Sequence, residues 1–298
     1  MEAAEPVRRT SEIEEITNLY VIHPIASRLT PLFADLHISP NAVSIAGMVF
    51  GILAGVSYAH YQDLRCTIAG FFLMIAWHVM DGADGQLARL TNSQSEFGKI
   101  IDGICDYVTF IAVYSGLALP LSRQYGKWVW LVVVAAGLCH AVQAAAYELQ
   151  RQEYNFWGWR RKSAALPELS AKPQNATAKS PAQWLADGLH RLYAKVQVLA
   201  DGGTGRFRKR LAAILQQQPE QDASIRRRYR EVFAPTVRRW SVMSSNYRTL
   251  AIFIFTLLKA PLYYFVFEII GLSMILVVLL FEQHARHALF LKGLEAAE

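Results

Sequence analysis

Four aspartates stand close together in the sequence, at spacings that would bring their carboxylates into one site. Asp81 and Asp84 are three residues apart, so they share one face of a helix. Asp102 and Asp106 are four residues apart and share a face in the same way. The first pair ends one apolar segment and the second pair begins the next. We therefore expect two antiparallel neighbouring helices that hold four carboxylates at one depth, at the cytoplasmic edge of a membrane.

Four carboxylates crowded at a low-dielectric boundary repel each other, and bound divalent cations relieve that repulsion. Ligands that offer only oxygen favour hard ions such as Mg²⁺ or Mn²⁺. Acidic residues at membrane depth are functional-site candidates for the same reason. The alternative is that the four aspartates cap helix ends separately, which the paired spacing on two facing helices disfavours.

Residues beside the aspartates fit the binding of a phosphate group. Gly85 and Gly98 would allow a ligand or a facing helix to approach the backbone closely. The guanidinium of Arg89 can bind two phosphate oxygens at once. Arg89 taken alone could equally be a positive charge that flanks a span on its cytoplasmic side.

This pattern resembles the signature of the CDP-alcohol phosphotransferase family. The signature reads D-x-x-D-G-x-x-A-R, then eight residues, then G-x-x-x-D-x-x-x-D. It is matched here by Asp81, Asp84, Gly85, Ala88, Arg89, Gly98, Asp102 and Asp106. The resemblance implies a pair of divalent ions on the four aspartates. It also implies that Asp106 acts as the general base on an acceptor hydroxyl.

The same resemblance implies where the nucleotide binds. Four signature residues would line the CDP site: Gly85, Ala88, Arg89 and Gly98. Pro40-Asn41-x-x-Ser44 is similar to a Pro-Asn-x-x-Thr stretch that also faces the nucleotide in the family, which adds Asn41 to the nucleotide-binding residues. Serine in place of threonine keeps the hydroxyl.

The activity implied by the resemblance is metal-dependent transfer of a substituted phosphate group in phospholipid or related polar-lipid synthesis. The donor would be CDP-diacylglycerol or a small CDP-alcohol, the acceptor an alcohol, and the product CMP. The family also implies a homodimer. Two other classes stay open: a transporter whose acids grip cations near mid-bilayer in broken helices, and a membrane-anchored binding protein that leaves the aspartates unused.

The elements that must position these residues are membrane helices. Hydrophobic residues make up 53% of the 298 residues and charged residues 18%, whereas soluble domains carry about a quarter charged residues. The net charge of +6 fits Lys and Arg on the cytoplasmic side and near anionic lipid better than a nucleic-acid partner. The three dispersed cysteines argue against a disulfide framework or a zinc knuckle.

The apolar pattern predicts an all-α bundle of six transmembrane helices. An amphipathic helix over 13–36 would precede them, lying on the membrane surface or packed on the protein. Spans are expected within 43–59, 67–80, 104–121 and 128–147, and two more in 250–281, with a hairpin at Lys259-Ala260-Pro261. The excess of Lys and Arg places the N-terminus and the aspartates on the cytoplasmic side.

The chain is expected to divide into three regions. Residues 1–147 carry the catalytic motif, 148–246 form a polar, basic cytoplasmic insertion with helices at 184–199 and 221–239, and 247–298 hold the last two spans and the tail. Gly47, Gly51 and Gly55 form a small-residue face for an intramolecular or a dimer contact.

Three histidines could be taken for part of the chemistry. His78 either bonds an aspartate or simply packs, and the sequence leaves these two readings open. His284 and His287 fit a polar helix surface better than a metal site, because no third ligand is evident.

Overall fold

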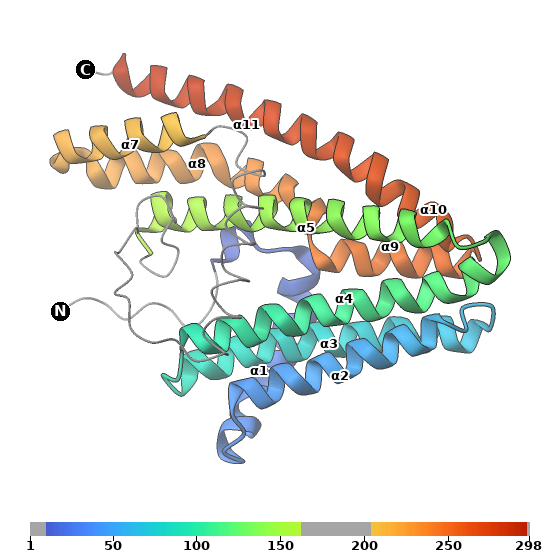
Figure 1. The fold of residues 1–298 in the computed structure, drawn as a ribbon. Helices are drawn as coiled ribbons and strands as arrows, with labels where there is room; N and C mark the ends of the chain where they lie inside the picture. The colour runs from blue at the N-terminus through green and yellow to red at the C-terminus, as the bar shows by residue number, and fades with distance from the viewer. Residues whose placement is uncertain (1–9, 162–203, 297–298) are drawn as a thin grey trace, which may run out of the picture. The chain divides into compact units, whose positions relative to one another are not determined.

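The computed structural model describes residues 10–161 and 204–296, and the regular elements in these ranges are helices (Figure 1). The predicted all-α class is therefore confirmed. The chain forms two compact units. Unit 1 comprises Met1–Cys139 and Ser245–Ile270, and unit 2 comprises His140–Ser244 and Gly271–Glu298.

Unit 1 contains the elements that carry the aspartates. Its helices are η1 (Ser11–Ile13), η2 (Asn18–Ile22), α1 (His23–Asp35), α2 (Pro40–Tyr58), α3 (Leu64–Leu90), α4 (Glu96–Tyr125), the start of α5 (Val129–Glu153), α9 (Ser245–Leu257), α10 (Pro261–Val266) and most of η7 (Phe267–Gly271). As expected, α3 and α4 run in opposite directions along α2 (Figure 1).

The first long helix begins where the sequence predicts it. Pro40 occupies the first turn of α2, where its missing N–H costs nothing. The side chain of Ser39 caps the helix by accepting a hydrogen bond from the Ala42 N–H at 3.3 Å. This cap fixes the start of α2, and so the register of Asn41 and Ser44.

The glycine face of α2 is used inside the chain. A Cβ built on Gly47 would lie 3.1 Å from the Met80 Cβ on α3. A Cβ on Gly55 would lie 2.5 Å from the carbonyl oxygen of Ala112 on α4. Both distances are shorter than ordinary van der Waals contact, so α2 approaches α3 and α4 this closely only because these positions lack side chains. Of the two readings of this face, the intramolecular one is confirmed.

The predicted amphipathic helix corresponds to η2 and α1. Ile22 and Ala26 are buried, and α1 packs along α3. Tyr20 and Leu36 are exposed. The reading as a helix packed on the protein therefore holds for one face, and its place on a membrane surface stays a prediction.

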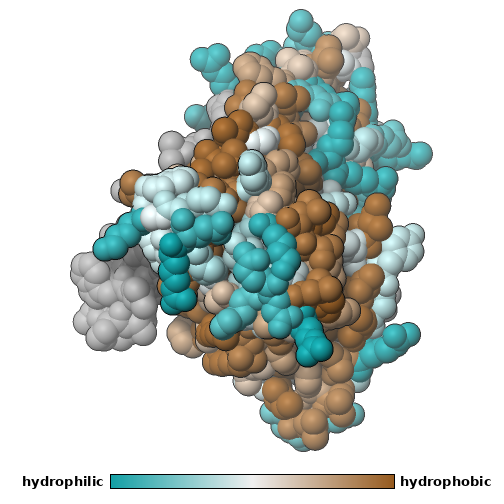
Figure 2. Space-filling model, turned by 90° about the vertical axis from the view of Figure 1, so that its right-hand side faces the viewer, coloured by the Kyte–Doolittle hydropathy of each residue, from teal (hydrophilic) through white to brown (hydrophobic). Residues whose placement is uncertain are grey.

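Five helical stretches in the described residues are long and apolar enough to cross a membrane: Pro40–Tyr58, Leu64–Leu90, Phe97–Tyr125, Val129–Gly158 and Pro261–Glu295. Exposed apolar side chains run along them, and Figure 2 shows broad apolar areas on one face of the molecule. The predicted count of six is not reached. The missing span corresponds to α9, whose 13 residues fall short of the roughly 20 that a bilayer crossing needs.

The predicted break before Pro261 is present. Lys259 has a φ of 58°, a left-handed conformation that ends α9 in the manner of a helix C-cap. Pro261 then occupies the first turn of α10, and α9 and α10 pack together.

Unit 2 combines the end of α5 with η3 (Tyr154–Gly158), α7 (Gly205–Gln217), η5 (Pro219–Gln221), α8 (Asp222–Trp240), η6 (Ser241–Met243) and α11 (Leu272–Glu295). The helix predicted at 221–239 is confirmed as α8, and the one predicted at 184–199 lies outside the described residues. The core of unit 2 is aromatic: Phe207, Tyr229, Phe233 and Phe290 are buried.

His287 also belongs to this core, so the prediction that it lies on a polar surface is wrong. Its ring stacks on Phe207 with centroids 3.7 Å apart, and its Nε2 lies 2.9 Å from the Gln283 amide nitrogen. Basic residues near His287 in the sequence made this part of α11 look polar, although one face of the helix is apolar and packs into the core of unit 2.

Candidate active site

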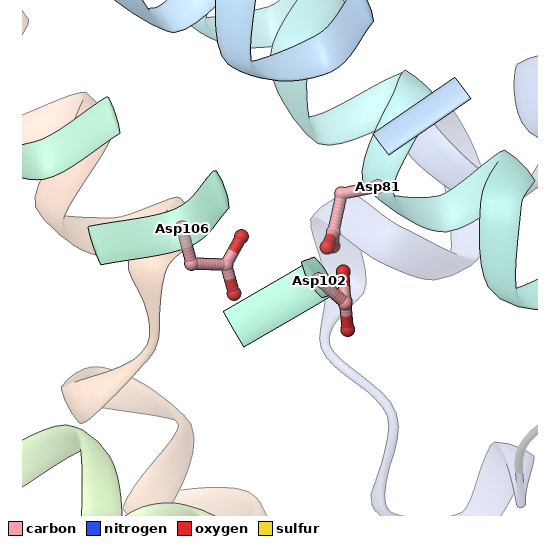
Figure 3. A group of neighbouring side chains, drawn as sticks. All are labelled: Asp81, Asp102 and Asp106. Atoms are coloured by element: carbon pink, nitrogen blue, oxygen red, sulfur yellow. The ribbon is translucent and has the colours of Figure 1, made fainter. Parts of the chain in front are cut away.

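Three of the four predicted aspartates converge. Asp81 comes from α3, and Asp102 and Asp106 come from one face of α4. Each offers a carboxylate oxygen, and these three oxygens lie within 4.8 Å of one another. Figure 3 shows the three side chains turned toward a common space. We call these residues the aspartate trio.

The trio has the chemistry and the spacing of a cation site. Hard divalent ions hold carboxylate oxygens at roughly 2.0–2.6 Å, so two oxygens on one ion are at most about 5 Å apart. The oxygens of the trio meet that limit without any movement of the helices. The residues present therefore fit a divalent cation.

Asp84 lines the same pocket but is held differently. It is buried, and its Oδ2 accepts a hydrogen bond from the Ser44 hydroxyl at 2.5 Å. A bond this short is typical of a charge-assisted contact between a hydroxyl and a carboxylate. Asp84 thus faces the trio while tied to α2, and its role as a metal ligand stays a prediction.

The sequence reasoning missed three residues that line the pocket. Gly47, Trp77 and Cys105 join the four aspartates and Ser44 in its wall. Their one signal in the sequence is helical spacing, because Trp77 lies four residues before Asp81. Without knowledge of the packing, an apolar residue at this spacing looks like ordinary core.

The predicted nucleotide-binding residues fall into two local groups. A Cβ built on Gly98 would lie 3.4 Å from Oδ1 of Asn41, so the starts of α2 and α4 are adjacent. A Cβ on Gly85 would lie 3.5 Å from an Arg89 guanidinium nitrogen, so that side chain folds back over the glycine. Ala88 is half-buried one position before Arg89. Their binding of a nucleotide stays a prediction.

The other side of the motif helix is packed by η2 and α1; the sequence allowed this segment to pack on the protein but did not predict its contact with α3. A Cβ on Gly82 would lie 3.3 Å from the Ile22 side chain, and the Ser27 hydroxyl donates to Oε1 of Gln86 at 2.9 Å. These contacts fix the rotation of α3 at Asp81, so η2 and α1 together help to aim the carboxylate.

The hydrogen bond of the His78 ring is to a threonine and not to an aspartate. Its Nε2 lies 2.9 Å from the Thr249 hydroxyl on α9, and its ring packs against Trp77. Of the two readings left open by the sequence, packing is the one found.

The comparisons with known proteins agree with the motif. The family described as CDP-alcohol phosphatidyltransferase matches residues 37–173, which include all eight signature positions. This match confirms the resemblance read from the sequence.

Curated relatives carry the same kind of activity in their names. The chain is 31% identical over 115 residues to a CDP-diacylglycerol–serine O-phosphatidyltransferase of Mycobacterium tuberculosis, covering 38% of each protein. It is 31% identical over 135 residues to the Helicobacter pylori protein of that name, covering 44% of this chain and 55% of the relative. A choline/ethanolaminephosphotransferase of Arabidopsis thaliana is 27% identical over 123 residues, covering 38% of this chain and 31% of the relative. The matches thus span less than two thirds of each relative.

Proposed function

We propose that this chain, which resembles the CDP-alcohol phosphatidyltransferases over residues 37–173, transfers a substituted phosphate group from a CDP-linked donor to an alcohol and releases CMP. The observation that carries the proposal is the convergence of the aspartate trio inside the matched region. The names of the relatives favour phospholipid or related polar-lipid synthesis.

The trio and Asp84 would hold two divalent ions, Mg²⁺ or Mn²⁺. When bound, these ions would neutralise the diphosphate of the donor and stabilise the charge that grows on CMP. Ser44 supports this arrangement because its hydroxyl orients the buried Asp84 carboxylate toward the pocket.

Asp106 would act as the general base. It belongs to the trio and is half-buried, so a hydroxyl group in the pocket can reach it. Asp106 would accept the hydroxyl proton of the acceptor while that oxygen attacks the phosphorus distal to cytidine. The new phosphorus–oxygen bond would form as the bond to the CMP oxygen breaks.

Two pairs of neighbouring residues, Asn41 with Gly98 and Gly85 with Arg89, would hold the nucleotide. Asn41 beside Gly98 would face one part of CDP, and Arg89 folded over Gly85 would meet a phosphate with its guanidinium. Ala88 lies next to Arg89, and its methyl side chain would leave space for the nucleotide. These roles come from the family resemblance, and the adjacency of the residues supports them.

The name of one relative gives CDP-diacylglycerol as its substrate, and the name of the other gives choline/ethanolaminephosphotransferase. We propose that the pocket holds the CDP part of the donor, whether this is CDP-diacylglycerol or a small CDP-alcohol. We place the pocket on the cytoplasmic side, on the distribution of Lys and Arg. A homodimer rests on the family resemblance alone.

The test is CMP release by the purified chain from CDP-diacylglycerol and from small CDP-alcohols, with a panel of radiolabelled acceptors. We expect release that EDTA abolishes and Mg²⁺ or Mn²⁺ restores. Asp106→Asn should bind CDP but lose about 10²–10⁴-fold in turnover. The matched control is Asp35→Asn, an exposed aspartate at the end of α1.

Normal turnover by Asp106→Asn would remove this residue from the mechanism. Cation flux into proteoliposomes without any CMP release would favour a transporter instead. The continuous path of α3 and α4 through the aspartates weighs against that reading, because transporter sites are typically built on interrupted helices.

A further inference from the structure

An aromatic pair lies one helical turn below the aspartate trio. Trp77 precedes Asp81 by four residues on α3, and Phe110 follows Asp106 by four residues on α4. The two helices are antiparallel (Figure 1), so positions four residues before Asp81 and four residues after Asp106 are both displaced to the same side of the trio. Their centroids are 5.4 Å apart at an interplanar angle of 89°, a well-formed edge-to-face contact.

Both rings are buried and pack against further side chains. Trp77 is 3% exposed and packs against His78, whose Nε2 is bonded to Thr249 on α9. Phe110 is 8% exposed and meets the Tyr114 ring edge-on at 6.1 Å. Neither ring can yield without moving a second helix or a second aromatic residue.

The two catalytic helices are tied to α2 at different points. Gly47 admits Met80 and Trp77 of α3, whereas Gly55 admits the backbone of α4 at Ala112. These contacts position each helix against α2. The ring pair is a direct contact between α3 and α4 themselves, at the level next to the carboxylates.

We propose that Trp77 and Phe110 act as a spacer that sets the distance between Asp81 and the two aspartates of α4, and thereby which divalent ion the trio prefers. The inference rests on the proposed metal role of the trio. Mg²⁺ demands near-octahedral geometry at 2.0–2.1 Å, whereas Ca²⁺ accepts longer and more variable distances. A loosened trio should therefore lose Mg²⁺ first.

Phe110→Leu removes the ring while it keeps an apolar side chain at the position. We expect the affinity for Mg²⁺ to fall about tenfold, as for other changes beside a metal-binding shell, and the affinity for Ca²⁺ to change much less. The measurement is Mn²⁺ binding to the purified, substrate-free protein by electron paramagnetic resonance, with Mg²⁺ and Ca²⁺ as competitors. The readout is the ratio of the two competition constants.

The control is Phe253→Leu. Phe253 of α9 stacks on Phe71 of α3 with centroids 4.3 Å apart, so this substitution removes an aromatic contact to the same helix and leaves both rings of the Trp77–Phe110 pair in place. We expect its Mg²⁺ to Ca²⁺ ratio to match that of the unmodified protein. Should Phe110→Leu fail to fold, the milder Trp77→Phe variant carries the same test.

The outcomes separate the spacer from the proposed function. If the unmodified protein binds no Mn²⁺, the proposed metal site itself is wrong. If it binds Mn²⁺ and Phe110→Leu, or Trp77→Phe in its place, keeps the original ratio, the spacer is wrong. An equal change of the ratio in Phe253→Leu would also overturn it, because the effect would then come from general loosening of α3.

Discussion

Units 1 and 2 each bury an arginine–glutamate pair, and the surroundings of the two pairs differ. In unit 1, Arg248 Nε donates to Glu268 Oε1 at 3.1 Å, and both side chains are at most 1% exposed. The hydroxyl of Tyr264 donates to the other Glu268 oxygen at 2.8 Å, and that hydroxyl lies 2.8 Å from the one of Tyr114. The charges of unit 1 are thus enclosed in a chain of hydrogen bonds.

In unit 2, the corresponding pair joins Arg208 of α7 to Glu153 at the end of α5, with a distance of 2.5 Å. Buried polar atoms without a hydrogen-bond partner in the described residues occur in both units: the hydroxyls of Tyr58 and Thr109 in unit 1, and Trp157 Nε1, Gln283 Oε1 and His287 Nδ1 in unit 2. Such atoms call for water in a native protein. The comparison teaches that the pair of unit 1 belongs to a hydrogen-bonded chain with two tyrosines, whereas the pair of unit 2 links the start of α7 to the end of α5.

One glycine in each unit shows how closely neighbouring atoms approach its backbone. In unit 1, a Cβ on Gly116 would collide with the backbone carbonyl oxygen of Gly55, which cannot move aside. In unit 2, a Cβ on Gly293 would lie 2.7 Å from the end of the flexible Arg228 side chain. At Gly116 the backbones of two helices are in direct contact, whereas Gly293 faces the movable end of a side chain.

The largest expected effect comes from breaking the enclosed pair. Arg248→Met leaves the Glu268 carboxylate buried without its counter-charge, which should cost about 3–5 kcal/mol of unfolding free energy. The double variant Arg248→Met with Glu268→Leu should regain most of that loss. The measurement is unfolding of the purified protein in mixed micelles, followed by circular dichroism.

The matched variant in unit 2 sharpens the comparison. Arg208→Met should cost less, because Glu153 ends α5 and a local opening of α7 would let water reach it. CMP release should persist in this variant. An equal or larger loss of stability than for Arg248→Met would contradict the contrast between the units.

The sequence could predict the parts of this picture that depend on local spacing. Asp102 and Asp106 converge with Asp81 as expected, because the i, i+4 spacing puts the first two on one face of α4, whereas Asp84 lines the same pocket without joining the trio. Partners distant in sequence could not be foreseen: Ser44 bonds Asp84, 40 residues on, and His78 bonds Thr249, 171 residues on. These contacts depend on how helices pack, which apolar periodicity does not specify.

The span count shows the same limit. Hydropathy marked the break before Pro261 correctly, because proline and a charged residue interrupt the apolar run. α9 begins at Ser245, before the apolar run predicted from residue 250, and it ends at Leu257 ahead of a left-handed turn at Lys259, a residue with no special preference for that conformation.

An intermediate effect is expected at the glycines. Gly116→Ala should destabilise unit 1 by about 1–3 kcal/mol, because the added methyl group forces α2 and α4 apart. Gly293→Ala should change stability by less than about 0.5 kcal/mol, because the Arg228 end can swing away. Both variants are compared by unfolding in micelles. Similar losses in the two would show that unit 2 is packed as tightly as unit 1.

The smallest effect is expected on the surface of α8, where neighbouring arginines make different contacts. Arg226 is mostly buried: it binds both Asp222 oxygens at 2.9 and 3.0 Å and donates to the Trp157 carbonyl oxygen at 2.7 Å. Arg227 is exposed and forms an ion pair with Glu231 on its own helix at 3.0 Å. The first arginine therefore ties α8 to η3, and the second does not.

Arg227→Ala should cost at most about 0.3–0.5 kcal/mol, because an exposed i, i+4 pair is screened by solvent. Arg226→Ala should cost about 1–3 kcal/mol, because it leaves carbonyl and carboxylate oxygens in the α8–η3 contact without their donor. The two are compared by denaturation at low and high salt, and only the Arg227→Ala difference should vanish at high salt. A loss above 1 kcal/mol for Arg227→Ala would mean that surface charge, rather than the aromatic core, holds unit 2 together.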